Sequence, residues 1–411
     1  MKIVTFLLLT GALVPASSAE LDSKALLETV RSKVLRNAKA VPRYVCRQEI
    51  ERQDFELTHD KKTPLPYDHP ARMCKLLSAE EPGKSPGLKL MDSDRAKLDV
   101  MLATGTELFA WPGERRFEVK TPTDLIGGGF SGNGDFAGFL IDVFAPQQAS
   151  FHYEGSCGAA DCVRFSYEIA PEVSRYTVST AQHHATVGFH GTFDVDPRSA
   201  DLIQMTVIAN DLQKWLGAVC ETRTRMTYRV NTDAGAFLVP QSSESEFLAA
   251  DGSYSVNRVS YLGCRRYTAE SVLSFAEDAG AKSNAPARAA ALPVAGSASR
   301  LRFTSKIDSE SSFAGDTVSA VLDRPVRDAA GGTISAGTYL RGHVAELKKL
   351  YGARPQVEIA MRFDTILLHD VPVPIRLEAR GKMDDRGRAQ FRFSGERIVL
   401  DKSFVSEWRV R

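Results

Sequence analysis

The sequence predicts a mainly β protein of the α+β class. We expect an N-terminal antiparallel curved sheet or half-barrel with inserted helices, a linker, and a small C-terminal β-barrel or sandwich. Three observations predict this fold. After Ser150 nearly every segment alternates apolar and polar residues with the period of two typical of half-buried strands. One amphipathic helical segment precedes the strands, and an Ala-, Pro-, Gly- and Ser-rich segment divides them at residues 278–300.

Residues 1–19 are predicted to be a cleavable secretory signal peptide. Lys2 supplies the positive charge, residues 3–14 form an apolar core, and Ser17, Ser18 and Ala19 are the small residues of a cleavage site. As a helix this core reaches only about 18 Å, short of a hydrocarbon layer of about 30 Å. No cysteine lies at the cleavage site. The mature protein is therefore expected to be periplasmic or secreted, without a lipid anchor and without a transmembrane segment after cleavage.

Charge and size narrow the function classes. The 52 basic and 51 acidic residues nearly balance, which argues against a nucleic-acid-binding protein and leaves no polybasic patch for a membrane surface. The chain is long enough for two domains with cores of their own, which we place at residues 20–277 and 301–411 on either side of the linker.

The first elements follow from local patterns. Residues 22–38 are predicted helical, with Asp22 or Ser23 as the N-terminal cap and Pro42 beyond the end. Residues 44–50 switch to strand alternation, and residues 58–93 are interpreted as a long surface excursion rich in Pro, Lys, Glu and Gly. From Lys97 the alternation returns, with turns at residues 104–105 and 112–113.

Residues 121–145 interrupt the strands. A short helical turn is predicted to open at Pro122, the glycine-rich segment 127–134 breaks it, and a helix led by Asp135 follows. Beyond it the alternation predicts a meander, which usually curls into a barrel or half-barrel. Its strands are expected at residues 150–155, 162–169, 173–180, 184–195, 202–209, 218–230, 237–249, 253–266 and 268–276. C-terminal strands are expected near residues 301–308, 316–323, 338–347, 355–366, 371–382 and 388–400.

An even number of cysteines in an exported chain favours disulfides over free thiols. Cys157 and Cys162 flank a predicted hairpin tip and are expected to pair, since their spacing does not match a structural zinc site. The partners of Cys46, Cys74, Cys220 and Cys264 stay open, because six cysteines allow fifteen pairings. A bridge between Cys46 and Cys74, across the base of the excursion, is one candidate.

Residues 22–276 resemble the LolA/LppX-type half-barrel of exported lipid and lipoprotein carriers. The resemblance lies in the leading helix, the long meander and the helices inserted midway, with a local match at residues 191–197 (GTFDVDP), Ser199 and residues 202–205 (LIQM). Residues 109–113 (FAWPG), 134–140 (GDFAGFL) and 264–267 (CRRY) resemble a family of uncharacterised exported bacterial proteins. Residues 332–342 (GTISAGTYLRG) are similar to a hairpin of small envelope β-barrels of the TrbI type, in which Gly337 would take a positive φ and Gly342 a bulge or a close strand approach.

Two glycine-containing motifs are weighed and set aside. Residues 127–132 fit G-x-G-x-x-G, but a dinucleotide site needs a parallel βαβ setting, so a hinge between two short helices is the better interpretation. Residues 129–133 nearly match a nucleophile elbow, yet Asn133 stands where the motif requires glycine. No cofactor is expected, and the protein is interpreted as non-enzymatic.

A histidine-rich strand offers weak metal candidates. On an unbroken strand over 184–195, alternation would place His184, His190, Asp194 and Asp196 on one face, a donor set that suits zinc or another divalent ion. Because Asp194 and Asp196 belong to a turn signature, a polar strand facing solvent is favoured. A metal-dependent hydrolase is the least favoured function.

The apolar face of the inserted helix, together with Trp111, is the candidate ligand site: Trp111, Phe136, Phe139, Leu140, Val143 and Phe144. These side chains either line a cavity for an acyl chain or pack on each other as core, and aromatic residues at helical spacing more often form core. The leading hypothesis is an exported binding protein for a lipid or other apolar ligand. The alternative is an envelope scaffold that contacts a partner protein through residues 301–411.

Overall fold

The structure is a computed structural model of the chain. It describes residues 22–40, 44–58, 69–78, 87–103, 106–114, 116–132, 134, 138–158, 161–180, 183–232, 237–266, 292–379 and 389–410. The predicted signal peptide, the predicted strand 268–276 and most of the predicted linker lie outside these residues. Within the described part of the chain, no helix is long and apolar enough to cross a membrane.

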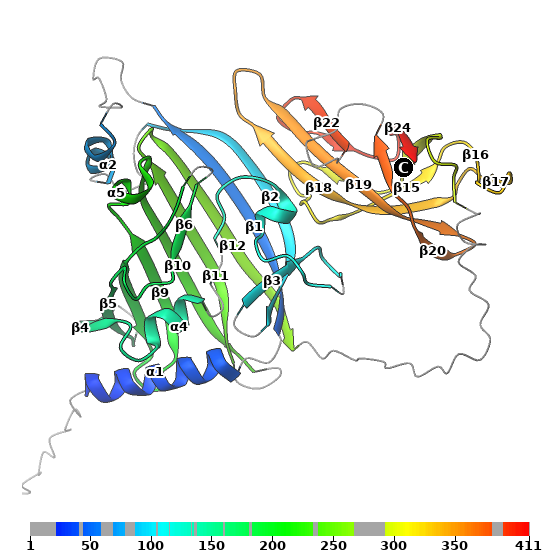
Figure 1. Ribbon diagram of the computed structural model, residues 1–411. Coiled ribbons are helices and arrows are strands. Elements are labelled where there is room, and N and C mark those ends of the chain that lie inside the picture. Colours follow the sequence, from blue (N-terminus) through cyan, green and yellow to red (C-terminus); the bar gives the residue numbers. More distant parts are fainter. Residues whose placement is uncertain are drawn as a thin grey trace, which may run out of the picture.

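The leading helix forms where the sequence predicts it. Helix α1 (Ser23–Ala40) begins after Asp22, whose Oδ1 accepts hydrogen bonds from the backbone N–H groups of Lys24 and Ala25, at 3.1 Å each. This satisfies two of the donors that a helix N-terminus leaves open. The helix lies across one end of the sheet (Figure 1) and buries Leu26, Val30 and Val34 against it.

The N-terminal unit is one curved antiparallel sheet. Its strands are ordered β4-β5-β8-β9-β10-β11-β12-β1-β2, and β2 also pairs with β3. Among the described residues no pairing joins β4 to β2 or β3, so the sheet is an open half-barrel. The strand bounds are β1 Tyr44–Leu57, β2 Leu88–Ala103, β3 Thr106–Ala110, β4 Ser150–Ser156, β5 Val163–Ile169, β8 Phe189–Val195, β9 Leu202–Ala209, β10 Val219–Asn231, β11 Phe237–Ala249 and β12 Ser253–Arg266.

Inserted elements fill the concave face. Helices α3 (Thr123–Ile126) and α4 (Gly138–Phe144) follow β3, and a separate two-stranded ribbon of β6 (Thr177–Ser179) and β7 (His184–Thr186) crosses in front of the sheet (Figure 1). Helix α4 and the ribbon contribute Val143, Phe144 and Val178 to a core that also contains strands β5 and β8–β10. A second core on the same face joins α3 to strands β1, β2 and β12 through Ile126.

Helices α2 (Pro70–Ser78) and α5 (Gln213–Leu216) were not expected from the sequence. Helix α2 falls in the predicted surface excursion, so that interpretation is wrong for residues 70–78 and for β2, which begins at Leu88. Met73 and Cys74 of α2 are buried against Leu248 and Val256. Each of these two residues is next in its strand to a side chain that points to the concave face. Because successive residues of a strand point to opposite faces, α2 covers the face opposite the concave one.

All six cysteines are paired. Cys157 bonds Cys162 across the hairpin between β4 and β5, which is the pair singled out from the sequence. Cys46 bonds Cys264, and Cys74 bonds Cys220, so the candidate bridge between Cys46 and Cys74 is wrong. The reason is topological: β1 and β12 are neighbours in the sheet, whereas α2 packs beside β10. Three disulfides are typical of proteins that fold in an oxidising compartment outside the cytoplasm.

The C-terminal unit is a small curled sheet. In this sheet β15 pairs with β18, and β18 pairs with β19. On the other side of β15 lie β13 and then β24, and β21, which pairs with β24, curls back toward β19 and β22. Trp408, Phe303 and Phe363 are fully buried at its centre. The bounds are β13 Ala298–Phe303, β14 Ile307–Asp308, β15 Thr317–Leu322, β16 Val326–Arg327, β17 Thr333–Ile334, β18 Tyr339–Leu350, β19 Gln356–Leu368, β20 Val371–Pro374, β21 Leu377–Ala379, β22 Ala389–Ser394, β23 Val399–Leu400 and β24 Val405–Val410.

The glycines of the predicted C-terminal hairpin take the roles expected of them. Gly337 has φ of 84°. A bulge lies between Arg341 and Gly342, where a Cβ on Gly342 would overlap the backbone carbonyl of Arg362. The described part of the predicted linker, residues 292–300, packs on this unit, because Gly296 N donates to Val410 O at 2.7 Å and β13 already begins at Ala298.

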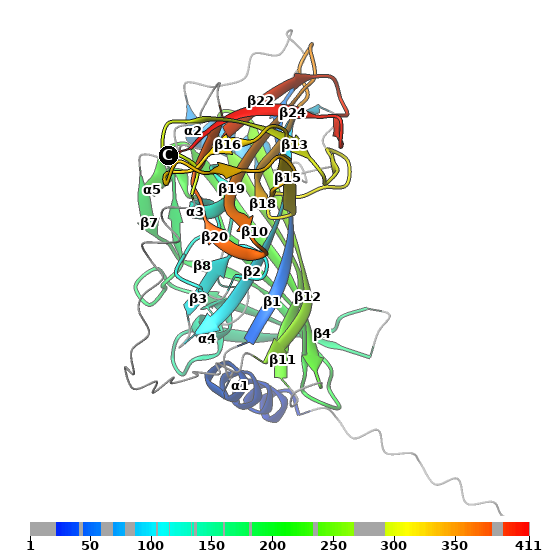
Figure 2. The same cartoon turned by 90° about the vertical axis from the view of Figure 1, so that its right-hand side faces the viewer.

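A single sheet joins the two units. Residues 92–94 of β2 pair with residues 348–350 of β18, in addition to their pairing with β1. Figure 2, which views the molecule from the side of the C-terminal unit, shows strands β1 and β2 running up to β18 and β19. The rings of Trp111 and His343 are 4.7 Å apart across the junction. Trp111 is therefore a junction residue.

Candidate functional site

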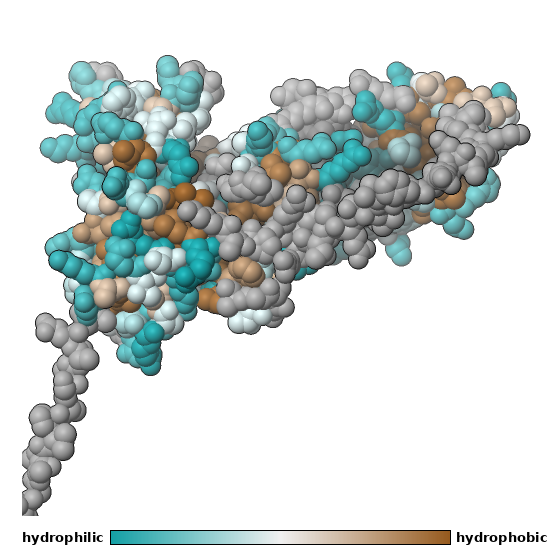
Figure 3. Space-filling view, turned by 60° about the horizontal axis from the view of Figure 1, so that its bottom comes forward, coloured by the Kyte–Doolittle hydropathy of each residue, from teal (hydrophilic) through white to brown (hydrophobic). Residues whose placement is uncertain are grey.

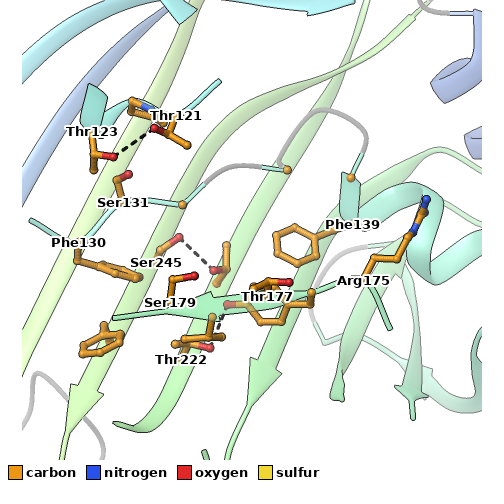
Figure 4. A pocket seen from close by; sticks show the side chains of 18 of the residues that line it. Thr121, Thr123, Phe130, Ser131, Phe139, Arg175, Thr177, Ser179, Thr222 and Ser245 are labelled. Atoms are coloured by element: carbon orange, nitrogen blue, oxygen red, sulfur yellow. Dashed lines mark hydrogen bonds between the residues drawn. The ribbon is translucent and has the colours of Figure 1, made fainter. Parts of the chain in front are cut away.

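The concave face of the half-barrel contains a pocket of about 530 Å³, within the range of roughly 300–1,000 Å³ typical of small-ligand sites. It lies between strands β10 and β11, helix α4, the ribbon β6–β7 and the segment 121–134 (Figure 4). Its lining residues are Thr121, Pro122, Thr123, Gly129, Phe130, Ser131, Gly132, Gly134, Gly138, Phe139, Asp142, Arg175, Tyr176, Thr177, Val178, Ser179, Thr222, Thr224, Ser245 and Phe247.

Aromatic rings form two walls of the pocket. On one side Phe139 of α4 meets Tyr176 edge-to-face, with ring centroids 5.2 Å apart. On the other side Phe130 of the glycine-rich segment lies against Phe247 of β11, with centroids 5.4 Å apart. Such walls contact apolar matter well and hold their shape, because aromatic side chains have few rotatable bonds.

The floor of the pocket is made of hydroxyl groups. Thr224 and Ser245, on neighbouring strands, hydrogen-bond each other at 3.0 Å, and Thr222 bonds the Tyr176 hydroxyl at 3.0 Å. Burial raises the pKa of Tyr176 above its usual value, so its hydroxyl stays protonated and can donate. Strands place these side chains here because residues two apart share one face of a sheet.

The charges of the pocket cancel. Arg175 Nε donates to Asp142 Oδ1 at 2.6 Å, and these are the charged side chains among the described lining residues. The guanidinium is mostly exposed, whereas the carboxylate is buried. Burial raises the pKa of Asp142, and the bond to Arg175 offsets part of that rise. Among the described lining residues, a ligand therefore meets a paired rim and not a free charge.

The six predicted ligand residues do not share one cavity. Phe139 lines the pocket, but Leu140, Val143 and Phe144 are buried in the core, where Phe144 packs on Phe193 with centroids 5.0 Å apart. Trp111 lies at the junction with the C-terminal unit, and Phe136 lies outside the described residues. A helix on a concave face has one side toward the sheet and one toward the opening, so its apolar stripe serves mainly as core.

The histidine cluster is divided by the fold. The predicted strand 184–195 breaks at Val187 and Gly188, where the chain leaves the ribbon and passes close to Ile169 and Pro171. His184 is an exposed residue of β7, and His190 belongs to β8 in the main sheet. They therefore do not share one strand face as expected.

The two aspartates of that cluster have structural partners. Asp194 forms a two-pronged ion pair with Arg164, at 2.7 and 2.8 Å, and Asp196 accepts the backbone N–H of Arg198 in the following turn. No group of three or more His, Cys, Asp or Glu side chains that could hold a metal ion occurs in the described part of the chain.

The glycine-rich segment forms one edge of the pocket. It follows α3 in an antiparallel setting, so the parallel βαβ surroundings of a dinucleotide site are missing from the described sheet. A Cβ on Gly129 would lie 3.0 Å from Arg52 Nη1, and one on Gly132 would lie 3.6 Å from Ser245 Oγ. Glycines therefore let this segment settle onto the floor of the concave face.

Sequence reasoning missed the hydroxyl floor. A signal was present: Thr222 and Thr224 on β10, and Ser243 and Ser245 on β11, recur at the period of two, at positions where a packed strand would carry apolar residues. Small hydroxyl residues on the inner face of a curved sheet leave space that larger apolar residues would fill.

The comparisons with known proteins do not assign the chain to a family. No protein-family model matches the chain, and no curated protein matches it. A search of solved structures found the crystal structure of the LolA superfamily protein NE2245 from Nitrosomonas europaea. It aligns with a TM-score of 0.26 and 10% sequence identity, over 59% of this chain and 94% of that one.

Proposed function

We propose that this protein is an exported, non-enzymatic binding protein, periplasmic or secreted, that holds an apolar chain or a similar apolar ligand in the concave pocket. The observation that carries the proposal is the pocket itself. It holds about 530 Å³ between rigid aromatic walls, on a face where the rest of the sheet is covered by packed side chains.

The surface of the molecule supports an internal site over a broad external one. Large apolar side chains that are exposed, such as Trp215, Leu262 and Val371, belong to separate elements. In Figure 3 hydrophilic and hydrophobic residues are interspersed over the visible face of the N-terminal unit. Single exposed apolar residues are ordinary on soluble domains and do not define a binding patch.

Ligand retention tests the proposal directly. The protein, purified without detergent, is examined by native mass spectrometry for a bound lipid. It is then titrated with N-phenyl-1-naphthylamine, a neutral apolar fluorophore. We expect saturable binding to one site per chain.

A blocking variant locates that site. Ser179 is an exposed residue that lines the pocket, so Ser179→Trp places an indole in it and should weaken probe binding at least about tenfold. Glu172→Trp, an exposed position just before the ribbon and outside the pocket lining, is the matched control and should bind as the unmodified protein does. No bound lipid and no saturable probe binding would refute the proposal.

A further inference from the structure

The hydroxyl floor continues beyond the pocket as a row of polar side chains across the sheet. The strand register places Thr224 opposite Ser245, Ser245 opposite Asn257, and Asn257 opposite Arg52. All four residues are buried. Directly opposed residues of neighbouring strands lie on one face, about 4.5–5.5 Å apart at Cβ. The row therefore runs from the floor of the pocket beneath the glycine-rich segment to Arg52.

One acceptor in this row lacks a partner. Asn257 is 3% exposed, and its Oδ1 accepts no hydrogen bond from the part of the chain that the structure describes. Buried side-chain oxygens are nearly always hydrogen-bonded, to protein or to another molecule. An open acceptor directly beside Ser245 thus points to a donor outside the described part of the chain.

The row offers hydrogen bonds but no net charge. Arg52 is held by Asp94 through two bonds of 2.7 and 2.6 Å, as Arg175 is held by Asp142 at the rim. Hydroxyl groups both donate and accept, whereas a carboxylate only accepts and an ammonium only donates. A neutral group with several O–H donors matches this floor better than either ion does.

We propose that the ligand is amphipathic, with an apolar chain between the aromatic walls and an uncharged, hydroxyl-bearing head group hydrogen-bonded to Thr224 and Ser245, the floor residues of the row that line the pocket. This inference rests on the proposed function and narrows its ligand class. The apolar chain lies against Phe139 and Phe247. The head group enters beside the glycine-rich segment, which lines the pocket next to Ser245.

Three ligands with the same eight-carbon chain test the head group: n-octyl β-D-glucoside, sodium octanoate and octyltrimethylammonium bromide. Each is titrated calorimetrically into the full chain below its micelle-forming concentration. We expect the glucoside to bind at least about tenfold more tightly than either ion, a difference of one or two neutral hydrogen bonds.

Variants separate the head group from the chain. Ser245→Ala and, independently, Thr224→Val should each raise the Kd of the glucoside about five- to tenfold and change the Kd of octanoate less than about twofold. Ser243→Ala is the matched control, since Ser243 is equally buried on the same face of β11 but does not line the pocket. Circular dichroism establishes that each variant is folded.

The outcomes distinguish the two proposals. If all three ligands bind alike, and Ser245→Ala matches Ser243→Ala, the head-group inference is wrong and the binding function stands. If none of the three binds to the folded protein, and Ser179→Trp does not alter probe fluorescence, both fall. A preference for the glucoside that is lost in Ser245→Ala supports both proposals.

Discussion

Arg52 holds the concave face together at the point where the sheet, the glycine-rich segment and the second core meet. Its side chain is buried, forms two bonds to Asp94 and lies 3.5 Å from the carbonyl oxygen of Gly127. The pair spans β1 and β2, which are directly paired at this position. A buried charge without its partner is far more costly than the intact pair is stabilising.

Removing one member of this pair should therefore destabilise the protein strongly. We expect Arg52→Met to lower the free energy of unfolding by about 3–5 kcal/mol, because Asp94, whose side chain is 13% exposed, keeps a mostly buried charge. The double variant Arg52→Met/Asp94→Leu should recover most of that loss, since apolar replacements of buried pairs are often neutral. Urea unfolding followed by circular dichroism measures both. A single-variant loss below about 1 kcal/mol would mean that the pair behaves as a solvent-exposed one.

Among the elements, those with strong local signals could be predicted from the sequence. Helix α1 could be predicted, because Asp22 and the apolar stripe after it specify a cap and a buried face. Strands β9 to β12 could also be predicted, because each is a long segment in which apolar and polar residues mostly alternate. The break between β7 and β8 was not predicted, because it depends on how Gly188 packs against Ile169 and Pro171, which are separated from it in the sequence and meet it only in the fold.

Elements and site residues that depend on tertiary contacts were missed. Helix α2 is short, and the sequence on either side of it is polar. Its formation is explained by its packing and by the disulfide between Cys74 and Cys220. Strand β24 was missed although Trp408 is fully buried in it. In the site, Phe139, which lines the pocket, was among the predicted residues. Thr224 and Ser245 were not, because the hydroxyl residues that recur at a period of two on β10 and β11 were not recognised as the inner face of a cavity.

The disulfides that hold α2 and the β4–β5 hairpin should differ in their effect on stability. Cys74 and Cys220 are 146 positions apart, and Cys157 and Cys162 are 5 apart. Closing a longer loop removes more conformational entropy from the unfolded chain. Replacing both cysteines by alanine should therefore lower the free energy of unfolding by about 2–4 kcal/mol at the first bridge, and by roughly half as much or less at the second.

The two alanine pairs are each other's control, because each removes one bridge and two sulfur atoms. Thermal unfolding of both variants beside the unmodified protein gives the comparison. Equal shifts in melting temperature would show that loop length does not set the contribution of these bridges.

At the scale of the whole molecule, the two units share backbone pairing and should unfold together. Besides the strand pairs of β2 and β18, Lys97 N donates to Ala314 O at 2.7 Å and Ala314 N to Arg95 O at 2.9 Å. Lys348 Nζ lies 3.0 Å from Asp92 Oδ1. Backbone hydrogen bonds of this kind fix the register between the units, whereas an isolated side-chain ion pair at a surface contributes little.

Gly315 allows this close approach, and replacing it should loosen the junction. Its φ is 95°, and a Cβ there would overlap the carbonyl oxygen of Lys97 and lie 3.1 Å from Pro112 Cδ. Gly337 also has a positive φ, of 84°, but a Cβ there meets nothing within 4 Å.

Both Gly315→Ala and Gly337→Ala should cost about 1–2 kcal/mol of backbone strain. Only Gly315→Ala should also separate the units. Scanning calorimetry should then show one transition for the unmodified protein and for Gly337→Ala, and two for Gly315→Ala. Identical traces for the two variants would mean that the junction does not couple the units.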